Sequence, residues 1–480
     1  MQNPRAVYEA ELEDYYSAFL KDCPAYQQTY TIDDLRVKEF NRLDRQKQVY
    51  LDYTGGGLYA LSQVNLHTRL LGKSVFGNPH SSNPASLRTT RLVQEARKKV
   101  LSYFKASPDE YLVIFTANAS GALKMVGESY PFRPESAYLL TFDNHNSVNG
   151  IREFARSGKS RVTYIPISLP DLLPDQKALK EQLDSCPRAG GLFAFPAQSN
   201  FSGVQHDLNW IPYARKRGWH VILDAAAFVP TNTLDLSRWK PDFIPLSFYK
   251  MFGYPTGVGC LLARKEALKT LHRPWFAGGT ITVASVQGDT FFLAEGAEGF
   301  EDGTLNYLAL PAVQTGLEFL ESVGMETIHQ RVMLLTGWLL AHLIALTHRN
   351  GRPLIRIYGP LSTRHRGSTL TMNFYDSDGR FFDHRLIERE ASSWNISLRT
   401  GCFCNPGGGE IALELSRNEL VTCFSSADSR LTFEDFRQCI DGKSSGAVRI
   451  SLGLVSNFSD VYRFFCFARQ FTDRTAGDFQ

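Results

Sequence analysis

The sequence predicts an α/β protein: a large domain built on a mainly parallel β-sheet, followed by a smaller C-terminal α+β domain. Three observations support this fold class. The chain has 480 residues, which is too long for one small core. Apolar runs alternate with helical patterns between about residues 111 and 248, as is typical of a parallel sheet covered by helices on both faces. From about residue 310, long amphipathic helices precede a second group of strand-type runs.

We divide the chain into a helical, charged N-terminal extension (1–47), a large domain (48–324) and a small domain (325–475). The run VYLDYTGGGLYAL after the extension predicts a strand that enters a Gly-rich turn, and helical spacing follows at about 85–105. Strands of the large domain are expected at 111–116, 137–142, 161–167, 191–196, 220–227 and 243–248. Helices are expected at 310–324 and 328–351, and small-domain strands at 354–359, 368–374, 396–401 and 447–453.

Composition excludes several classes of protein. Hydrophobic residues make up 43% and charged residues 21%, as in an ordinary globular protein. The net charge of +3 gives no electrostatic reason to expect nucleic-acid binding. No apolar run approaches the roughly 20 residues that cross a bilayer. The N-terminus is polar and acidic-aromatic, unlike a signal peptide, so we expect a cytoplasmic protein without membrane contact.

The eight cysteines are scattered, and only Cys402 and Cys404 stand close together. A C-x-C pair without a second Cys/His pair nearby is weak evidence for zinc, so no metal site is expected. A chain of this size does not need disulfides, and a reactive or buried thiol is expected at each position.

One aspartate and one lysine stand in unusually apolar surroundings. Asp224 ends the run HVILD, at a strand C-terminus where open α/β sheets place their sites. Lys250 follows the next β-type run, within LSFYKMFGYPTG. A lysine after a strand is usually a solvated surface residue, but an apolar setting lowers the pKa of the amine and suits covalent chemistry. Together they match pyridoxal phosphate (PLP), which needs a lysine for attachment and a carboxylate for its ring nitrogen.

A phosphate site is expected at 116–122, where TANASGA lies between a strand and a helix. Small residues, hydroxyls and free backbone N–H groups at a helix N-terminus bind phosphate. Asn118 or Ser120 could equally serve only as a helix N-cap, and the sequence leaves both interpretations open.

Nine segments together resemble the class V PLP enzymes, which implies a type I PLP-transferase fold. They are GNPHSSNPAS (77–86), VIFTANASGALK (113–124), HNSVNGIREFA (145–155), QSNFSG (198–203), LDAAAFVP (223–230), SFYKMFGYPTGVG (247–259), FEDGTLNYLALPAV (300–313), LRTGCFCNPG (398–407) and AVRISLG (447–453). In detail they are similar to the desulfurase domain of eukaryotic molybdenum cofactor sulfurases, and more distantly to group II cysteine desulfurases. The likeness runs in unbroken order from about residue 48 to 470.

The resemblance implies a role for each cofactor residue. Lys250 would carry PLP, Asp224 would pair with the pyridine nitrogen, and His145 would stack on the ring and handle protons. Asn200 would donate to the phenolic oxygen. The phosphate contacts would come from Ser120, Ser247, Tyr249 and, from the partner subunit of a homodimer, Thr304.

The resemblance also implies how the substrate is held. Arg399 and Arg449 would grip the α-carboxylate, a task suited to the planar guanidinium. Arg449 lies in an otherwise apolar strand pattern, and a buried arginine needs an anionic partner. Cys404 falls where the persulfide-forming cysteine stands, on a Gly-rich loop expected to be flexible and exposed. Cys402 is expected to be structural or a backup.

The sequence departs from the family pattern in three places. Ala227 stands where many cysteine desulfurases have Gln or His, although the cofactor sulfurases resemble this chain there. The turn DYTGGG (52–57) has more glycine than expected, which puts the substrate fit beside it in question. The chain ends where the desulfurase domain ends, so we expect a separate protein to accept the sulfur.

Two enzymatic functions remain open at this point. The favoured one is a sulfurtransferase of the cysteine desulfurase kind, which converts L-cysteine to alanine and leaves a persulfide on Cys404. The alternative is a PLP-dependent C–S lyase, racemase or condensing enzyme of specialised metabolism, which would not need Cys404. A non-catalytic regulatory scaffold is disfavoured, because both Lys250 and Asp224 are present.

Overall fold

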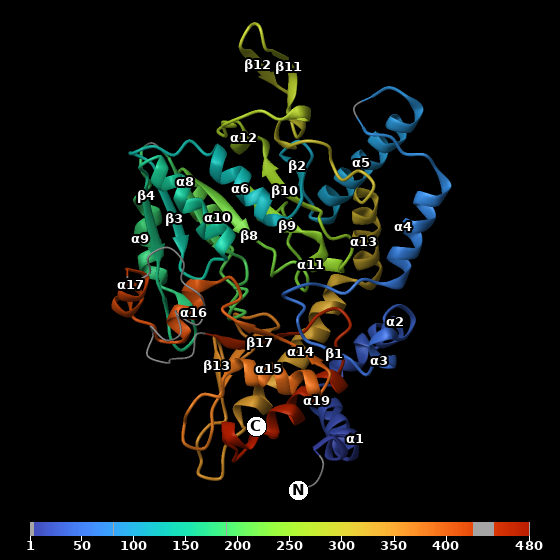
Figure 1. Cartoon of the computed structure of the whole chain (residues 1–480), viewed down its shortest axis with the longest axis vertical. Coiled ribbons are helices and arrows are strands. Elements are labelled where there is room, and N and C mark those ends of the chain that lie inside the picture. The colour runs from blue at the N-terminus through green and yellow to red at the C-terminus, as the bar shows by residue number, and fades with distance from the viewer. Residues whose placement is uncertain (1–3, 80, 189, 426–445, 480) are drawn as a thin grey trace.

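The structure is a computed structural model that describes residues 4–79, 81–188, 190–425 and 446–479. A large domain surrounds one central sheet, and a smaller domain below it holds both ends of the chain (Figure 1). The central sheet has the strand order β2-β10-β9-β8-β7-β3-β4. Its strands are β2 (Tyr111–Thr116), β3 (Ala137–Thr141), β4 (Arg161–Ile165), β7 (Gly191–Pro196), β8 (Trp219–Asp224), β9 (Phe243–Ser247) and β10 (Gly259–Arg264). The predicted α/β fold is confirmed.

Strand direction determines where the sheet can carry a site. Neighbours from β9 to β4 run parallel, whereas β10 lies antiparallel between β9 and β2. Because β10 is antiparallel to both of its neighbours, β2 runs parallel to β9. Six of the seven strands therefore end at the same edge of the sheet. Strand β10 was not predicted from the sequence, because its short apolar run follows directly on a Gly-rich turn.

The strands are buried on both faces, which explains their nearly continuous apolar sequences. In β3, Leu139 belongs to one hydrophobic core, whereas Tyr138 and Leu140 belong to the other. The helices that contribute to the first core include α5 (Pro84–Tyr103) and α13 (Leu310–Val323), and those of the second include α6 (Ala119–Ser129) and α8 (Ile151–Ser157).

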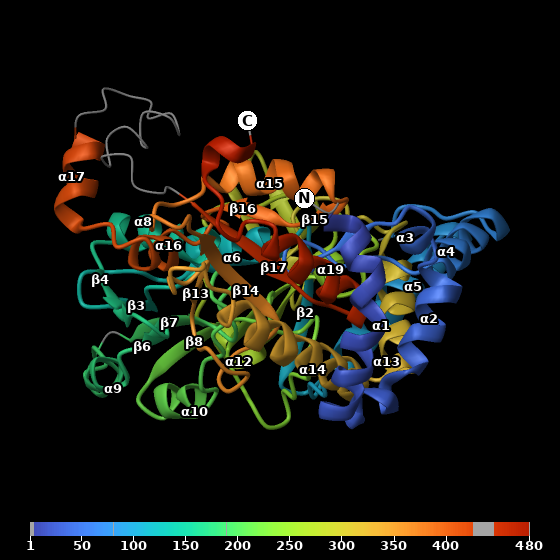
Figure 2. The same ribbon diagram turned by 90° about the horizontal axis from the view of Figure 1, so that it is seen from below.

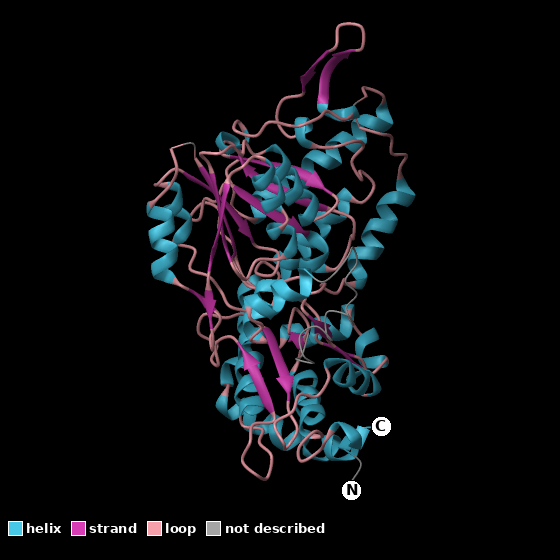
Figure 3. Ribbon diagram, turned by 60° about the vertical axis from the view of Figure 1, so that its left-hand side comes forward, coloured by secondary structure: helices cyan, strands magenta, loops and turns pink. Residues whose placement is uncertain are grey.

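The small domain is built on a four-stranded antiparallel sheet of order β13-β14-β17-β16, visible in the lower half of Figure 3. Its strands are β13 (Ile355–Tyr358), β14 (Thr369–Phe374), β16 (Arg399–Gly401) and β17 (Ala447–Ser451), and its helices include α14 (Met325–Ile344), α15 (His384–Ser393) and α19 (Phe458–Arg469). All four expected strand regions occur, although the run 396–401 divides into β15 (Ile396–Ser397) and β16.

The N-terminal extension packs on the small domain. Helix α1 (Pro4–Asp22) lies beside α19 (Figure 2). The buried Arg331 of α14 donates a hydrogen bond of 2.8 Å to the carboxylate of Asp33. The strand expected after the extension is only two residues long, β1 (Val49–Tyr50), and pairs with β15 rather than with the central sheet. The domain boundaries themselves stay a prediction.

Within the described ranges, no helix is long and apolar enough to cross a membrane. The same ranges hold no cluster of three or more His, Cys, Asp or Glu residues that could bind a metal ion.

Cys423 is disulfide-bonded, which corrects the expectation of a thiol at every cysteine. Cys439 lies outside the described residues. Among the described residues, Cys23, Cys186, Cys260, Cys402, Cys404 and Cys466 are free thiols.

Candidate active site

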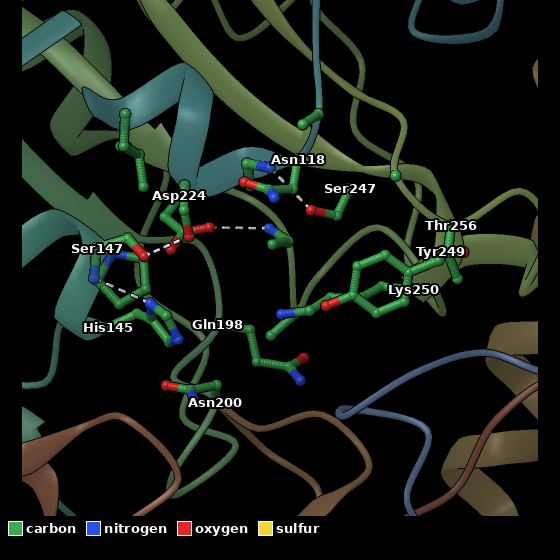
Figure 4. A pocket seen from close by; sticks show the side chains of 18 residues that line it. Asn118, His145, Ser147, Gln198, Asn200, Asp224, Ser247, Tyr249, Lys250 and Thr256 are labelled. Carbon is green, nitrogen blue, oxygen red and sulfur yellow. Dashed lines mark hydrogen bonds between the residues drawn. The ribbon is translucent and has the colours of Figure 1, made fainter. Parts of the chain in front are cut away.

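A cavity of about 400 Å³ lies at the edge where the parallel strands end (Figure 4). The segments that follow β2, β3, β7, β8 and β9 all contribute to its walls, because parallel strands bring their carboxyl ends to one edge. Seven of the eight expected cofactor residues line it, namely Ser120, His145, Asn200, Asp224, Ser247, Tyr249 and Lys250.

Lys250 lies in the short helix α11 (Phe248–Phe252), immediately after β9. Its amino group points into the cavity (Figure 4). Burial lowers the pKa of this amine, Asp224 opposes the shift, and Arg449 reinforces it. A lowered pKa increases the neutral fraction, which is the nucleophilic form that a covalent attachment needs.

Asp224 is the last residue of β8, and its carboxylate accepts a hydrogen bond of 3.1 Å from the N–H of Ala226. The small side chains of Ala226 and Ala227 also line the cavity. These small side chains leave space beside the carboxylate for a planar ring, and the carboxylate can keep a proton on the ring nitrogen.

His145 caps helix α7 (Asn146–Asn149), and its Nδ1 accepts a hydrogen bond of 3.1 Å from the N–H of Ser147. In the neutral ring the proton therefore lies on Nε2. Burial lowers the pKa of His145, Asp224 opposes the shift, and Lys250 adds to it. A neutral imidazole can stack on a pyridine ring and exchange a proton at Nε2.

The segment TANASGA, in the turn after β2, provides a helix N-cap and also has the features of a phosphate site. Asn118 is the N-cap of α6, and its side chain accepts from Gly121 at 2.9 Å. Ser120 is not the cap, and its hydroxyl instead lies 2.6 Å from that of Ser147. Ser247 accepts from the N–H of Ala119 at 2.9 Å. Hydroxyl groups thus surround the N-terminus of a helix of 11 residues, an arrangement that suits a phosphate. With the lysine, carboxylate and imidazole, the residues present fit PLP.

The two expected carboxylate-binding arginines converge on Asp52, in the turn after β1. Arg399 donates to its carboxylate at 2.7 Å and Arg449 at 3.1 Å. Arg449 also donates to the main-chain oxygen of Asn200 at 2.9 Å, which connects it to the cavity wall. Arg449 is buried, whereas the Arg399 side chain is half exposed. The buried arginine therefore has the anionic partner that its sequence context requires.

Cys404 is exposed, and it lies in a loop tied to the cavity at several points. Its carbonyl oxygen accepts from the N–H of Asn146 at 2.7 Å, next to His145. The preceding Phe403 carbonyl accepts from the side chain of Asn200 at 2.8 Å. The following Asn405 is fully buried and donates to the Asn200 side chain at 2.9 Å.

The glycines after Cys404 do not make a flexible loop, which corrects the sequence-based expectation. Gly407, Gly408 and Gly409 are buried in helix α16 (Pro406–Ala412). A Cβ at Gly407 would lie 2.0 Å from the Phe142 carbonyl oxygen, so glycine serves close packing there. Between residues 401 and 410, only Cys402 and Cys404 are exposed.

Thr304 is the one expected cofactor residue that lies elsewhere. It lines a second cavity, of about 610 Å³, together with Gly77, Asn78 and Gly278.

Three residues near the site received no role from the sequence, namely Asp52, Gln198 and Ser147. All three lie in segments that the sequence analysis quotes. Asp52 could have been found from its strand-end position and from the need of Arg449 for an anion.

Comparisons with known proteins place the chain in a family and support its fold. The model of the family "Aminotransferase class-V" matches residues 49–464. The molybdenum cofactor sulfurase of Solanum lycopersicum is 38% identical over 94% of this chain, and the chain spans 59% of that relative's length. Among solved structures, an apo cysteine desulfurase from Thermococcus onnurineus has a TM-score of 0.75 at 20% identity, covering 91% of this chain and 97% of its own.

A second solved structure is the cystine C–S lyase C-DES in complex with cysteine persulfide, with a TM-score of 0.66 at 18% identity over 88% of this chain and 98% of its own. These structural likenesses establish the fold, and the family match rests on the sequence itself. The chain belongs to the aminotransferase class V family.

Proposed function

We propose that this protein is a PLP-dependent cysteine desulfurase, which takes the sulfur of L-cysteine as a persulfide on Cys404. One observation carries the proposal. The Cys404 thiol is exposed, yet its residue is joined to the cofactor cavity, because its carbonyl accepts from the N–H of Asn146, next to His145, and the carbonyl before it accepts from Asn200. A nucleophile that must receive sulfur at the cofactor and deliver it outside needs both properties.

The residues of this chain divide the reaction between them. PLP, held by Lys250 and Asp224, would supply the electron sink for the bonds at the substrate α-carbon. Arg449 and Arg399 hold the substrate carboxylate. The thiolate of Cys404 attacks the substrate sulfur, so that an S–S bond forms while the Cβ–Sγ bond breaks and its electron pair stays on carbon. The Lys250 amine or His145 Nε2 provides a proton to that carbon, and alanine leaves.

A C–S lyase is the second candidate, and one observation favours it. The peptide groups on both sides of Cys404 are hydrogen-bonded to the cavity wall, which restricts the reach of the thiol. A lyase eliminates sulfide from the substrate and releases pyruvate, and it needs no moving cysteine.

A homodimer and a separate sulfur acceptor are part of the proposal. The hairpin of β11 (Ile281–Ser285) and β12 (Thr290–Leu293) projects from the large domain with exposed apolar side chains, including Phe292 (Figure 1). Thr304 faces a cavity other than that of its own cofactor residues. Both features support a second copy of the chain that covers the hairpin and receives Thr304.

The deciding experiment incubates the PLP-loaded protein with L-cysteine and a reductant, and measures sulfide, alanine and pyruvate, with D-cysteine measured alongside. Sulfide with equimolar alanine is the expected result. Pyruvate in place of alanine would establish the lyase, D-cysteine would indicate a racemase, and the absence of all products would refute both sulfur chemistries.

A further inference from the structure

The carboxylate of Asp52 lies between the two arginines that we propose to bind the substrate carboxylate. It lies within hydrogen-bond distance of both guanidinium groups, at 2.7 Å from Arg399 and 3.1 Å from Arg449. The Asp52 side chain is only 11% exposed and that of Arg449 only 3% exposed, so solvent screens little of their interaction.

The surrounding turn is built to keep this carboxylate in place. Tyr50 donates its hydroxyl proton to the Gly56 carbonyl at 2.8 Å, and the N–H groups of Gly55 and Gly56 donate to the Asp52 carbonyl. A Cβ at Gly55 would lie 2.5 Å from an Asp52 carboxylate oxygen and 2.8 Å from Arg399. Gly55, the first glycine of the unexpected run, therefore makes room for the ion pairs.

The three groups together carry one net positive charge, because one carboxylate offsets one of two guanidinium groups. Arg449 retains a buried Nε with no hydrogen-bond partner, and Arg399 is half exposed. An incoming carboxylate can pair with the remaining charge. A ligand with a second acidic group would bring two negative charges to a site with one net positive charge, and Asp52 would repel the charge that stays uncompensated.

We propose that Asp52 is a specificity-determining residue that restricts this site to amino acids with one carboxylate and excludes those with an acidic side chain. The inference rests on the proposed function, because it takes the two arginines as the substrate-carboxylate site. It adds a residue that selects against acidic side chains at that site.

The test compares L-alanine and L-aspartate as ligands of the PLP-loaded protein, with dissociation constants measured by calorimetry. The wild-type protein should bind L-alanine at least about tenfold more tightly than L-aspartate, since a like charge a few ångströms away has at least that effect. Asp52→Asn keeps the shape of the side chain and removes its charge. It should lower the dissociation constant of L-aspartate relative to that of L-alanine by about tenfold or more.

Glu388→Gln is the matched control. Glu388 accepts from Thr400, next to Arg399 in the chain, and has no bond to either arginine. This substitution removes one carboxylate from helix α15, which packs against the strand of Arg399, and it should leave the ratio at the wild-type value.

An unchanged ratio in a folded Asp52→Asn protein would overturn the proposal. If that variant does not fold, the dissociation constants of the wild-type protein decide. Tighter binding of L-aspartate than of L-alanine, or binding of neither ligand, would then overturn the proposal. Sulfide release from L-cysteine, measured on the same preparation, separates a failure of the proposed function from a failure of the role of Asp52. Retained charge selection without sulfide release refutes the proposed function alone, whereas sulfide release without charge selection refutes the role of Asp52 alone.

Discussion

The side-chain amide of Asn200 donates a hydrogen bond of 2.8 Å to the main-chain carbonyl of Phe403. It joins the wall of the cofactor cavity to the residue that precedes Cys404. Phe403 and Cys404 have φ values of 56° and 55°, in the left-handed region. That conformation costs a non-glycine residue about 1–2 kcal/mol, so the loop depends on bonds of this kind to keep its shape.

Replacing Asn200 with Ala should release the Cys404 loop. We expect alkylation of Cys404 by iodoacetamide to become about tenfold faster or more, because the Asn200 side chain makes two hydrogen bonds to this loop, with Phe403 and Asn405, and each contributes about 1 kcal/mol to the opening equilibrium. Peptide mapping by mass spectrometry gives the rate, and the exposed Asn209→Ala provides the control. An alkylation rate equal to that of the wild type would show that these bonds do not restrain the loop.

The two exposed cysteines should differ sharply in function. Cys404→Ser should bind L-cysteine yet lose several orders of magnitude in sulfur transfer, about 4 kcal/mol or more of barrier, because a hydroxyl is a poor nucleophile toward sulfur. Cys402→Ser is the matched control and should lose about tenfold or less. Mass spectrometry should detect a persulfide on Cys404. Near wild-type turnover by Cys404→Ser would favour the lyase.

Covalent attachment of PLP should depend on Lys250 alone. Lys250→Ala should lack the visible absorbance band of the attached cofactor and give no adduct after borohydride reduction. The exposed Lys269→Ala should retain both. A borohydride-fixed adduct on another lysine of the Lys250→Ala protein would refute the assignment.

His145 should make the folded protein sensitive to acid. Burial lowers its pKa below the ordinary value of 6.5, so below that pH the unfolded chain binds a proton that the folded chain does not. Stability therefore falls as the pH drops from about 6.5. His145→Asn keeps a helix cap and should lose less Tm between pH 7 and pH 5, measured by circular dichroism. The exposed His272→Asn should follow the wild type, and a parallel loss in all three proteins would contradict the shift.

The β11–β12 hairpin should hold a homodimer together. Phe292 is 63% exposed, and Phe292→Asp should shift the protein toward monomer, because obligate interfaces bury more than about 2,000 Å² of largely apolar surface. Light scattering at micromolar concentration measures the mass. Val37→Asp, at a residue 66% exposed on α2 (Thr31–Glu39), is the control. A fully active wild-type monomer would refute the composite site.

The central sheet could be predicted because its information is local. Buried parallel strands consist of apolar runs, and these runs by themselves place Asp224 at the end of β8 and Lys250 shortly after β9. The resemblance of the motifs added a role for each of the other residues, and the cavity indeed contains His145 and Asn200.

Only the tertiary structure decided the contacts between distant segments. The pairing of β1 with β15 and the antiparallel insertion of β10 depend on partners far away in the chain, which no local periodicity encodes. The anion that satisfies Arg449 is Asp52, almost 400 residues earlier. The glycines after Cys404 proved to be packing residues rather than hinges, because whether glycine bends or packs depends on the neighbours that the fold brings to it.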